Sequence, residues 1–268
     1  MLRLAEILVT NDDGIFSPGL RAAVEAVLEL GEVVVVAPRR QQTSMGRSLQ
    51  ANPEAVLMPV PFKIRGMSVR AYHCECSPAM AVRHGMRVLY NEKKPDLVVS
   101  GINYGENLGI NISTSGTIGA ALEGASHGVP ALAVSKQTDI ESHREYTEQN
   151  WNVAAYFLKH FSKILLSGKV PIDVDVLKID IPETANERTP WRLTRLARQP
   201  YYSSVLSRPS LKSRISDAKT TIDLCPSSLV SGTDIHAFIN QQAVSVTPLS
   251  LDLTSRINFE EMCRFLEE

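Results

Sequence analysis

Short runs of apolar residues, each closed by a polar turn or a proline, recur through the first 185 residues of the chain. They lie at residues 7–9, 33–37, 97–100, 131–134 and 174–181. Their Val, Ile and Leu content is typical of strands buried on both faces, although alternating polar positions in the last run indicate one less buried face there. Between the runs, apolar residues recur at helical spacing in segments that begin near Ser17, Ser77, Ser115 and Trp151. This alternation predicts an α/β fold with a mainly parallel sheet.

Two regions depart from this alternation. Residues 51–76 alternate polar and apolar positions and contain three prolines, which predicts short edge strands or a hairpin. Residues 186–242 are polar and serine-rich without a convincing helical period, so we expect an irregular or β-rich extension. Residues 243–248 predict a returning strand, and 258–266 a final helix. The expected organisation is one domain, with a core over 1–185, the extension over 186–242 and the returning strand and helix over 243–268.

Composition narrows the class of protein. The 268 residues are 44% hydrophobic and 21% charged, and the net charge is −1, which argues against nucleic-acid or anionic-membrane partners. The sequence shows neither a secretory signal nor a membrane-spanning apolar run. Four cysteines in a chain of this length are too few for a disulfide framework and favour a reducing compartment. We therefore expect a soluble cytoplasmic protein.

Oxygen-rich side chains follow the first predicted strand. Asn11, Asp12 and Asp13 lie where ligands bind in open α/β sheets, outside the carboxyl end of a strand. Paired carboxylates there are suited to a hard divalent cation such as Mg²⁺ or Mn²⁺. The alternative is an ordinary turn, since Asp and Gly are common turn residues.

Two further loops are expected at the same edge of the sheet. Residues 38–48 carry hydroxyls and three arginines, suited to a phosphate or simply to solvent. Residues 100–117, rich in Gly, Asn, Ser and Thr, exceed the usual length of a strand–helix connection. In this loop Asn103 offers a neutral ligand, and Ser115-Gly116-Thr117 begins a helix that can bind an anion. Together the loops favour metal-dependent hydrolysis of a phosphate ester.

Other kinds of site fit the sequence less well. The glycines do not form a G-x-G-x-x-G pattern, so a dinucleotide site is not supported. His73, Cys74 and Cys76 lack the second ligand pair of a structural zinc site and are expected to be core residues. A haloacid-dehalogenase-type phosphatase needs two aspartates separated by one residue, whereas Asp12 and Asp13 are adjacent.

Motifs spread from residue 7 to about 254 resemble those of the SurE (survival protein E) nucleotidases. They are Thr10-Asn11-Asp12-Asp13-Gly14, Val36-Ala37-Pro38-Arg39-Arg40 with the following Thr43-Ser44, Ser100-Gly101-Ile102-Asn103, Gly105-x-Asn107-Leu108-Gly109, Ser115-Gly116-Thr117-x-x-Ala120-Ala121-x-Glu123-Gly124, Gly232-Thr233-Asp234 and Val246-Thr247-Pro248-Leu249. The resemblance implies a Rossmann-like three-layer α/β/α core with a C-terminal β-rich extension used to form a homodimer or homotetramer. It implies a phosphomonoesterase that acts on nucleoside 5′- and 3′-monophosphates with one divalent cation, Mg²⁺ or Mn²⁺, per subunit.

The same resemblance assigns expected roles to individual residues. The metal ligands are expected to be Asp12, Asp13, Thr43 and Asn103, with Ser44 as the alternative to Thr43. Asp12 is the expected catalytic residue, as a ligand and possible base for water attack, with a phospho-aspartyl route left open. Asn11 is expected to assist catalysis by stabilising phosphate oxygens. Substrate contacts are expected from Asn11, Ser44, Asn103, Ser115, Gly116 and Thr117.

The sequence departs from the usual family pattern at two places outside the expected metal ligands. Met80 stands where an acidic residue is usual before the second helix, and Asn111 replaces an acidic residue of the long loop. These changes leave two other functions open. One is a non-catalytic nucleotide-binding module, and the other is a phosphatase acting mainly on other phosphomonoesters or on short polyphosphate.

Overall fold

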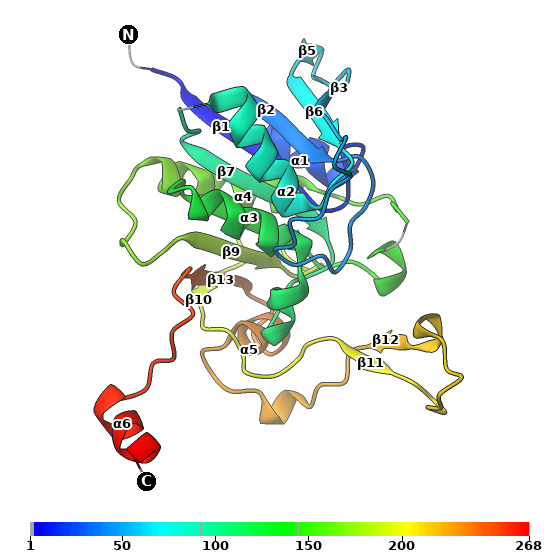
Figure 1. Ribbon diagram of the computed structural model, residues 1–268, viewed down its shortest axis with the longest axis vertical. Coiled ribbons are helices and arrows are strands. Elements are labelled where there is room, and N and C mark those ends of the chain that lie inside the picture. The colour runs from blue at the N-terminus through cyan, green and yellow to red at the C-terminus, as the bar shows by residue number, and fades with distance from the viewer. Residues whose placement is uncertain (1–2, 92, 144, 268) are drawn as a thin grey trace.

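A nine-stranded, mainly parallel sheet runs through the centre of the computed structural model, which describes residues 3–91, 93–143 and 145–267 (Figure 1). Its strand order is β10-β13-β9-β8-β7-β1-β2-β6-β3. Six neighbouring strands are parallel: β9 (Val176–Ile181), β8 (Ala131–Lys136), β7 (Leu97–Tyr104), β1 (Ala5–Thr10), β2 (Gly31–Pro38) and β6 (Arg70–Cys74). The predicted α/β fold is confirmed.

The two edges of the sheet are antiparallel to this parallel block. At one edge β3 (Met58–Pro59) pairs with β6, and a separate hairpin joins β4 (Lys63–Ile64) to β5 (Met67–Ser68). At the other edge β13 (Val244–Leu249) pairs antiparallel with β9, and β10 (Trp191–Leu193) pairs parallel with β13. The expected edge strands of residues 51–76 and the returning strand are therefore present. The extension adds β10 to the main sheet as well.

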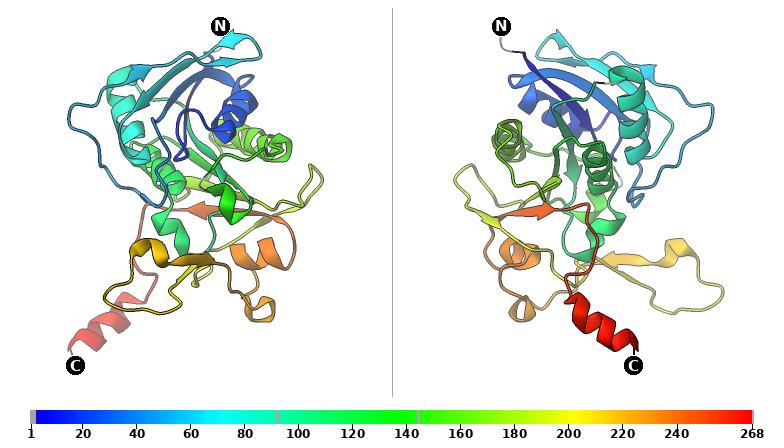
Figure 2. Two further views of the ribbon diagram at one scale, coloured as in Figure 1. Left: turned by 90° about the vertical axis from the view of Figure 1, so that its right-hand side faces the viewer. Right: turned by 60° about the vertical axis from the view of Figure 1, so that its left-hand side comes forward.

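Helices cover both faces of the sheet, which produces three layers (Figure 2). One face packs against α1 (Pro18–Val27) and α4 (Asn152–Leu166), and the other against α2 (Pro78–Gly85) and α3 (Gly116–Ser126). Alternate residues of β1 enter the two cores, with Ile7 in the first and Leu8 in the second. Strands buried on both faces explain the unbroken apolar runs of the sequence.

The predicted starts of the helices agree with the observed caps in most cases. Ser77 and Ser115 occupy N-cap positions, and their side chains accept hydrogen bonds from the amides of Met80 and Ile118. Ser17 is at the N-cap of α1 but makes no side-chain cap hydrogen bond. Beyond Gly85 the second helix continues as one wider turn over Met86–Tyr90.

The extension differs from its prediction in one respect. It contains a short helix, α5 (Asp234–Ile239), which packs with Leu108 of the long loop in a third small core. A two-stranded arm (residues 203–221) is formed by β11 (Ser203–Val205) and β12 (Lys219–Thr221). The arm and the final helix α6 (Phe259–Glu267) project from the body of the protein (Figures 1 and 2).

The strand at residues 176–181 contradicts the expectation of one less buried face. All of its residues are buried, and Lys178 and Asp180 are completely inaccessible to solvent. These two charged groups are tolerated because they pair with each other, and Lys178 pairs with Asp234 of α5 as well. No helix of the described residues is long and apolar enough to cross a membrane.

Candidate active site

The loops that follow β1, β2 and β7 meet at one edge of the sheet. These three strands are neighbours, and Val9 of β1 pairs in register with Val35 on one side and Val99 on the other. The loops line a cavity of about 910 Å³. Its lining includes the four expected metal ligands, Asp12, Asp13, Thr43 and Asn103.

Asp12 is held against the N-terminus of α3. It is 7% exposed, and its Oδ1 accepts a hydrogen bond of 2.5 Å from the hydroxyl of Thr117. The helix approaches so closely because residue 116 is glycine, where a Cβ atom would lie 2.7 Å from the Cβ of Asp12. The partial positive charge of the helix terminus also favours an ionised carboxylate at this place.

Asp13 is still more buried, at 2% exposure, and is oriented by weaker contacts. Its carboxylate accepts hydrogen bonds of 3.3 Å from the Tyr104 amide and from the Gln41 side chain. The hydroxyl of Tyr146 donates to its backbone carbonyl at 2.5 Å. Both carboxylates therefore have a defined place beside the cavity.

The protonation behaviour of the two carboxylates matches a site built for a cation. Burial raises the pKa of Asp12 to about 6, against the opposing effect of the Thr117 hydrogen bond. Burial and the neighbouring charge of Asp12 raise the pKa of Asp13 well above its usual range. Neither carboxylate forms an ion pair with a basic residue in the described part of the chain. A divalent cation between them would relieve both penalties.

Thr43 and Ser44 present their hydroxyls from an exposed turn of the second loop. Ser44 has a φ of 61°, an uncommon left-handed conformation for a residue other than glycine. The loop is anchored on either side of this turn, because the Gln42 amide donates to the Asp12 carbonyl and the Gly46 amide to the Thr114 carbonyl. The structure brings both hydroxyl residues to the cavity and keeps both as candidate ligands.

The second loop is further secured by an ion cluster on α3. The fully buried Glu123 pairs with Arg47 of the loop at 3.0 Å and with Arg83 of α2 at 2.5 Å. Asn103, 9% exposed, is oriented by donating from Nδ2 to the Gly105 carbonyl at 2.7 Å, which leaves its Oδ1 for a cation. No group of three or more His, Cys, Asp or Glu side chains suits a metal in the described ranges. The candidate site therefore depends on two carboxylates with neutral oxygens.

Asn11, Gly116 and Thr117 do not line the cavity, contrary to expectation. Asn11 is fully buried; its Nδ2 donates to the Gly14 carbonyl at 3.2 Å, and its Oδ1 accepts from the Gly14 amide at 3.1 Å. This geometry gives Asn11 the task of closing the turn that carries the two aspartates. Gly116 and Thr117 lie beneath Asp12 and position it. Of the expected anion site at the helix start, Ser115 lines the cavity.

A family model described as Survival protein SurE matches residues 7–203 of the chain. The chain belongs to the SurE family. A relative named 5′-nucleotidase SurE from Methanothrix thermoacetophila is 39% identical over 98% of this chain and 99% of its own length. One of the same name from Thermococcus kodakarensis is 39% identical over 97% and 98%. The crystal structure of SurE protein from Aquifex aeolicus covers 98% of this chain and 100% of its own, with a TM-score of 0.73 and 32% identity.

The two departures from the usual SurE pattern have separate structural settings. Asn111 accepts hydrogen bonds from the amides of Tyr201 (2.6 Å) and Tyr202 (3.0 Å) and donates to the Tyr202 carbonyl at 3.2 Å. A carboxylate could not make the last of these bonds, so asparagine fixes the start of the arm. Met80 is partly buried and packs in the core beneath α2, away from the cavity lining.

Several cavity residues were not anticipated from the sequence of this SurE family member. Gln41 comes from the loop after β2, Tyr104 and Glu106 from the end of β7 and the loop after it, and His143 from the loop after β8. The others are Tyr202, just before the arm, and the arm residues Ser203, Ser216 and Lys219. The motif Gly105-x-Asn107 pointed to the loop after β7. The arm gave no such signal, because its place over the cavity depends on contacts far apart in the sequence.

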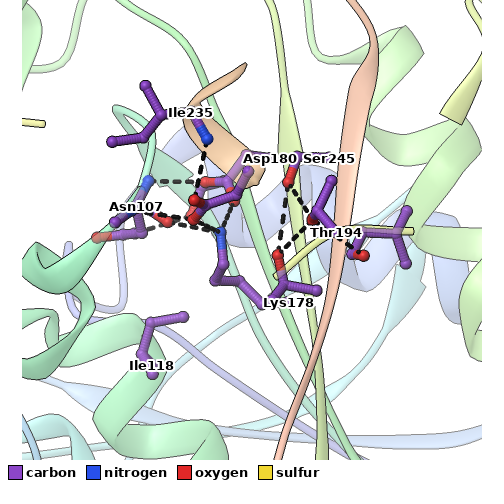
Figure 3. A network of polar contacts seen from close by, with 12 residues as sticks. Asn107, Ile118, Lys178, Asp180, Thr194, Ile235 and Ser245 are labelled. Carbon is purple, nitrogen blue, oxygen red and sulfur yellow. Dashed lines mark hydrogen bonds and ion pairs between the residues drawn. The ribbon is translucent and has the colours of Figure 1, made fainter. Parts of the chain in front are cut away.

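A buried ion cluster ties the long loop to the extension (Figure 3). Lys178 pairs with Asp180 and, at 3.3 Å, with Asp234, and its ammonium donates to the Asn107 carbonyl at 2.8 Å. Asp180 accepts from the Asn107 amide at 2.7 Å, and Asp234 from the Gly109 amide at 2.9 Å. The cluster therefore fixes the loop after β7, which carries Glu106 and directly follows the strand that ends with Asn103 and Tyr104.

Proposed function

We propose that this chain is a divalent-metal-dependent phosphomonoesterase that hydrolyses nucleoside 5′- and 3′-monophosphates to nucleoside and phosphate. The observation that supports this most strongly is the buried Asp12–Asp13 pair, which meets the hydroxyls of the second loop and Asn103 at one cavity. The volume of about 910 Å³ is in the range of small-molecule sites. Relatives named 5′-nucleotidase SurE over nearly the whole chain support the substrate class.

Asp12, Asp13, Thr43 and Asn103 would hold one Mg²⁺ or Mn²⁺ per subunit, with Ser44 as the alternative hydroxyl ligand. These donors are the oxygen ligands that hard cations prefer. A cation held there supplies Lewis acidity toward a phosphoryl oxygen and makes a bound water more acidic.

The protein's own groups then orient the substrate and move the proton. Thr117 and the N-terminus of α3 hold Asp12 in a fixed rotamer, from which its carboxylate accepts the proton of the attacking water. Ser115, which lines the cavity at the start of α3, contacts the phosphate oxygens. The alternative is attack by Asp12 itself on phosphorus. Rapid acid quenching with ³²P-labelled AMP distinguishes the two routes, because a labelled protein appears only in the second.

A panel of nucleoside monophosphates, p-nitrophenyl phosphate and short polyphosphate, assayed with Mn²⁺, Mg²⁺ and EDTA, tests the function. We expect release of phosphate from AMP that EDTA abolishes. Binding of AMP without hydrolysis in any metal would instead indicate a nucleotide-binding module. A much higher kcat/KM for p-nitrophenyl phosphate or polyphosphate than for AMP would indicate a phosphatase that acts mainly on other substrates.

We also propose that a second copy of this chain covers α6, as a homodimer or within a homotetramer. None of the described residues of α6 is buried, although Phe259, Phe265 and Leu266 form an apolar face. An isolated nine-residue helix is unstable in water, so it needs a partner surface. Light scattering after size exclusion should give a multiple of the 29.5 kDa chain mass, and Phe265→Asp should shift it toward one chain. A monomeric wild type would contradict this proposal.

The compartment proposed for this protein is the cytoplasm. All four cysteines are free, and Cys74 and Cys76 remain unlinked although both are buried in the same core. Free buried thiols suit a reducing environment. Nucleoside monophosphates are the proposed small-molecule partners, with no nucleic acid or membrane required.

A further inference from the structure

Three side chains lining the candidate active-site cavity carry buried polar atoms that lack a hydrogen-bond partner among the described residues. The atoms are Oε2 of Glu106, Nε2 of His143 and Oη of Tyr202. Unpartnered buried polar atoms are uncommon in folded proteins and are often explained by a ligand that completes them. Their gathering at the same cavity as the two aspartates points to a substrate contact.

These three residues, here called the polar wall, come from separate segments but pack together. Glu106 follows β7, His143 ends the turn Ile140–His143 after β8, and Tyr202 precedes the arm. The rings of His143 and Tyr202 meet edge to face with centroids 5.8 Å apart. Gly105 has no side chain, and a Cβ there would lie 2.3 Å from Nε2 of His143. The imidazole therefore packs directly on the backbone beside Glu106.

Of the three residues of the polar wall, Glu106 has the side chain whose burial costs the most free energy. It is only 2% exposed and forms no ion pair within the described part of the chain. Burial raises its pKa to about 7, and the hydroxyls of Tyr201 and Tyr202 nearby oppose this shift only in part. A carboxyl group in such a place is costly unless a ligand supplies a hydrogen-bond donor.

We propose that Glu106, His143 and Tyr202 form the subsite for the sugar of the substrate and make the enzyme prefer ribonucleotides to 2′-deoxyribonucleotides. This inference rests on the nucleotidase function proposed above. The 2′-hydroxyl is a sugar hydroxyl that stays free in both 5′- and 3′-ribonucleoside monophosphates. It can donate to the Glu106 carboxyl while accepting from the Tyr202 hydroxyl. The His143 ring, packed on the Gly105 backbone, supports the Tyr202 ring edge to face.

The position of the polar wall favours the sugar over the base. Glu106 lies three residues after Asn103, just beyond the end of β7, so the polar wall adjoins the proposed phosphate and metal site. In a nucleotide the sugar is the group next to the phosphate, whereas the base lies farther out. The arm also lines the cavity, through the exposed residues Ser204 and Lys219 among others. Exposed residues of this kind discriminate less between substrates than buried polar groups do.

The test compares kcat/KM for AMP, 2′-deoxy-AMP and p-nitrophenyl phosphate, which has no sugar, with saturating Mn²⁺. The wild type should prefer AMP to 2′-deoxy-AMP by about tenfold or more, as for a hydrogen bond to a charged group. Glu106→Ala should bring that ratio close to one while leaving turnover of p-nitrophenyl phosphate within about twofold. Glu106→Gln keeps an acceptor oxygen and should retain part of the preference.

Glu183→Gln is the matched control, because it removes the same charge from an exposed residue outside the cavity lining. It should keep the full preference for AMP. Thermal unfolding of Glu106→Gln at pH 7.5 should occur at or above the wild-type temperature, because burial raises the pKa of Glu106 to about 7 and makes its ionised form costly in the folded protein. A lower unfolding temperature would show a structural role for Glu106 and count against the subsite.

Equal kcat/KM of the wild type for AMP and 2′-deoxy-AMP would overturn the sugar subsite. So would a Glu106→Ala variant that loses activity equally on AMP and p-nitrophenyl phosphate. Failure of the proposed function looks different, since the wild type would then show no metal-dependent hydrolysis of AMP. That result would overturn the nucleotidase function and the subsite together.

Discussion

Replacing Lys178 by methionine removes the ammonium group that two buried carboxylates share. Lys178, Asp180 and Asp234 are all fully inaccessible to solvent. After the change Asp234 keeps three backbone donors, the amides of Gly109, Ala197 and Ile235, each at 2.9 Å. Asp180 keeps the Asn107 amide but loses its cation. The principal cost is therefore one buried, uncompensated carboxylate.

Breaking a buried ion pair by removal of one partner typically costs about 3–5 kcal/mol. We expect Lys178→Met to lose about this much free energy of unfolding in urea. For a protein of this size each kcal/mol lowers the Tm by roughly 2–4 °C. Because the cluster also holds Asn107 and Gly109, the variant should bind Mn²⁺ more weakly in titration calorimetry.

Two further variants make the Lys178 experiment specific. Lys159→Met breaks an exposed ion pair with Glu29 and should leave the free energy of unfolding nearly unchanged. Lys178→Met combined with Asp180→Leu removes the unpaired charge and should recover part of the lost stability. If Lys178→Met unfolds within about 1 kcal/mol of the wild type, the buried cluster does not have the stabilising role argued from its contacts.

Two further predictions concern buried carboxylates of the site and of the ion cluster. Gly116→Ala places a Cβ 2.7 Å from the Cβ of Asp12, so the substitution should displace Asp12. Calorimetry should then show Mn²⁺ binding weakened at least tenfold. Unchanged affinity for Mn²⁺ would show that the close approach of α3 to Asp12 is not needed. Burial raises the pKa of Asp12 and Asp180 to about 6 and that of Glu106 to about 7, so the metal-free folded protein binds protons more tightly than the unfolded chain. These groups destabilise the folded state above their folded pKa values, and this penalty is relieved as the pH falls through 7 and 6. In EDTA the Tm should therefore be higher at pH 5.5 than at pH 7.5, and the opposite order would contradict the burial of these charges.

The central strands could be predicted because their environment is uniform. Leu8 and Val9 are buried on opposite faces of the sheet, so the central positions of β1 select apolar residues whichever helix covers them. The place of the two aspartates at the cavity could be predicted for a related reason. Polar residues directly after such a strand lie at the edge where the loops of neighbouring strands converge.

Lys178 and Asp180 show why features that depend on contacts between distant segments could not be predicted. Alternation of polar and apolar residues normally marks a half-exposed strand, and it misleads here because Asp234 approaches from 54 positions further along the chain than Asp180. The same applies to Tyr202, which reaches the cavity through the hydrogen bonds of Asn111. Asn11 has a side chain that could act as a ligand. Its two hydrogen bonds with Gly14 show that this side chain closes the turn instead.

Phosphate release from AMP by the wild type and by Asp12→Asn, each with Mn²⁺ and with EDTA, is the decisive measurement for the proposed metal-dependent hydrolysis at Asp12. Asparagine keeps the shape of Asp12 but lacks the charge that holds the cation and accepts the proton. We expect activity that EDTA abolishes in the wild type, and a loss of at least a hundredfold in Asp12→Asn with its fold intact by circular dichroism. Full metal-dependent turnover of AMP by Asp12→Asn would contradict the assignment of the site.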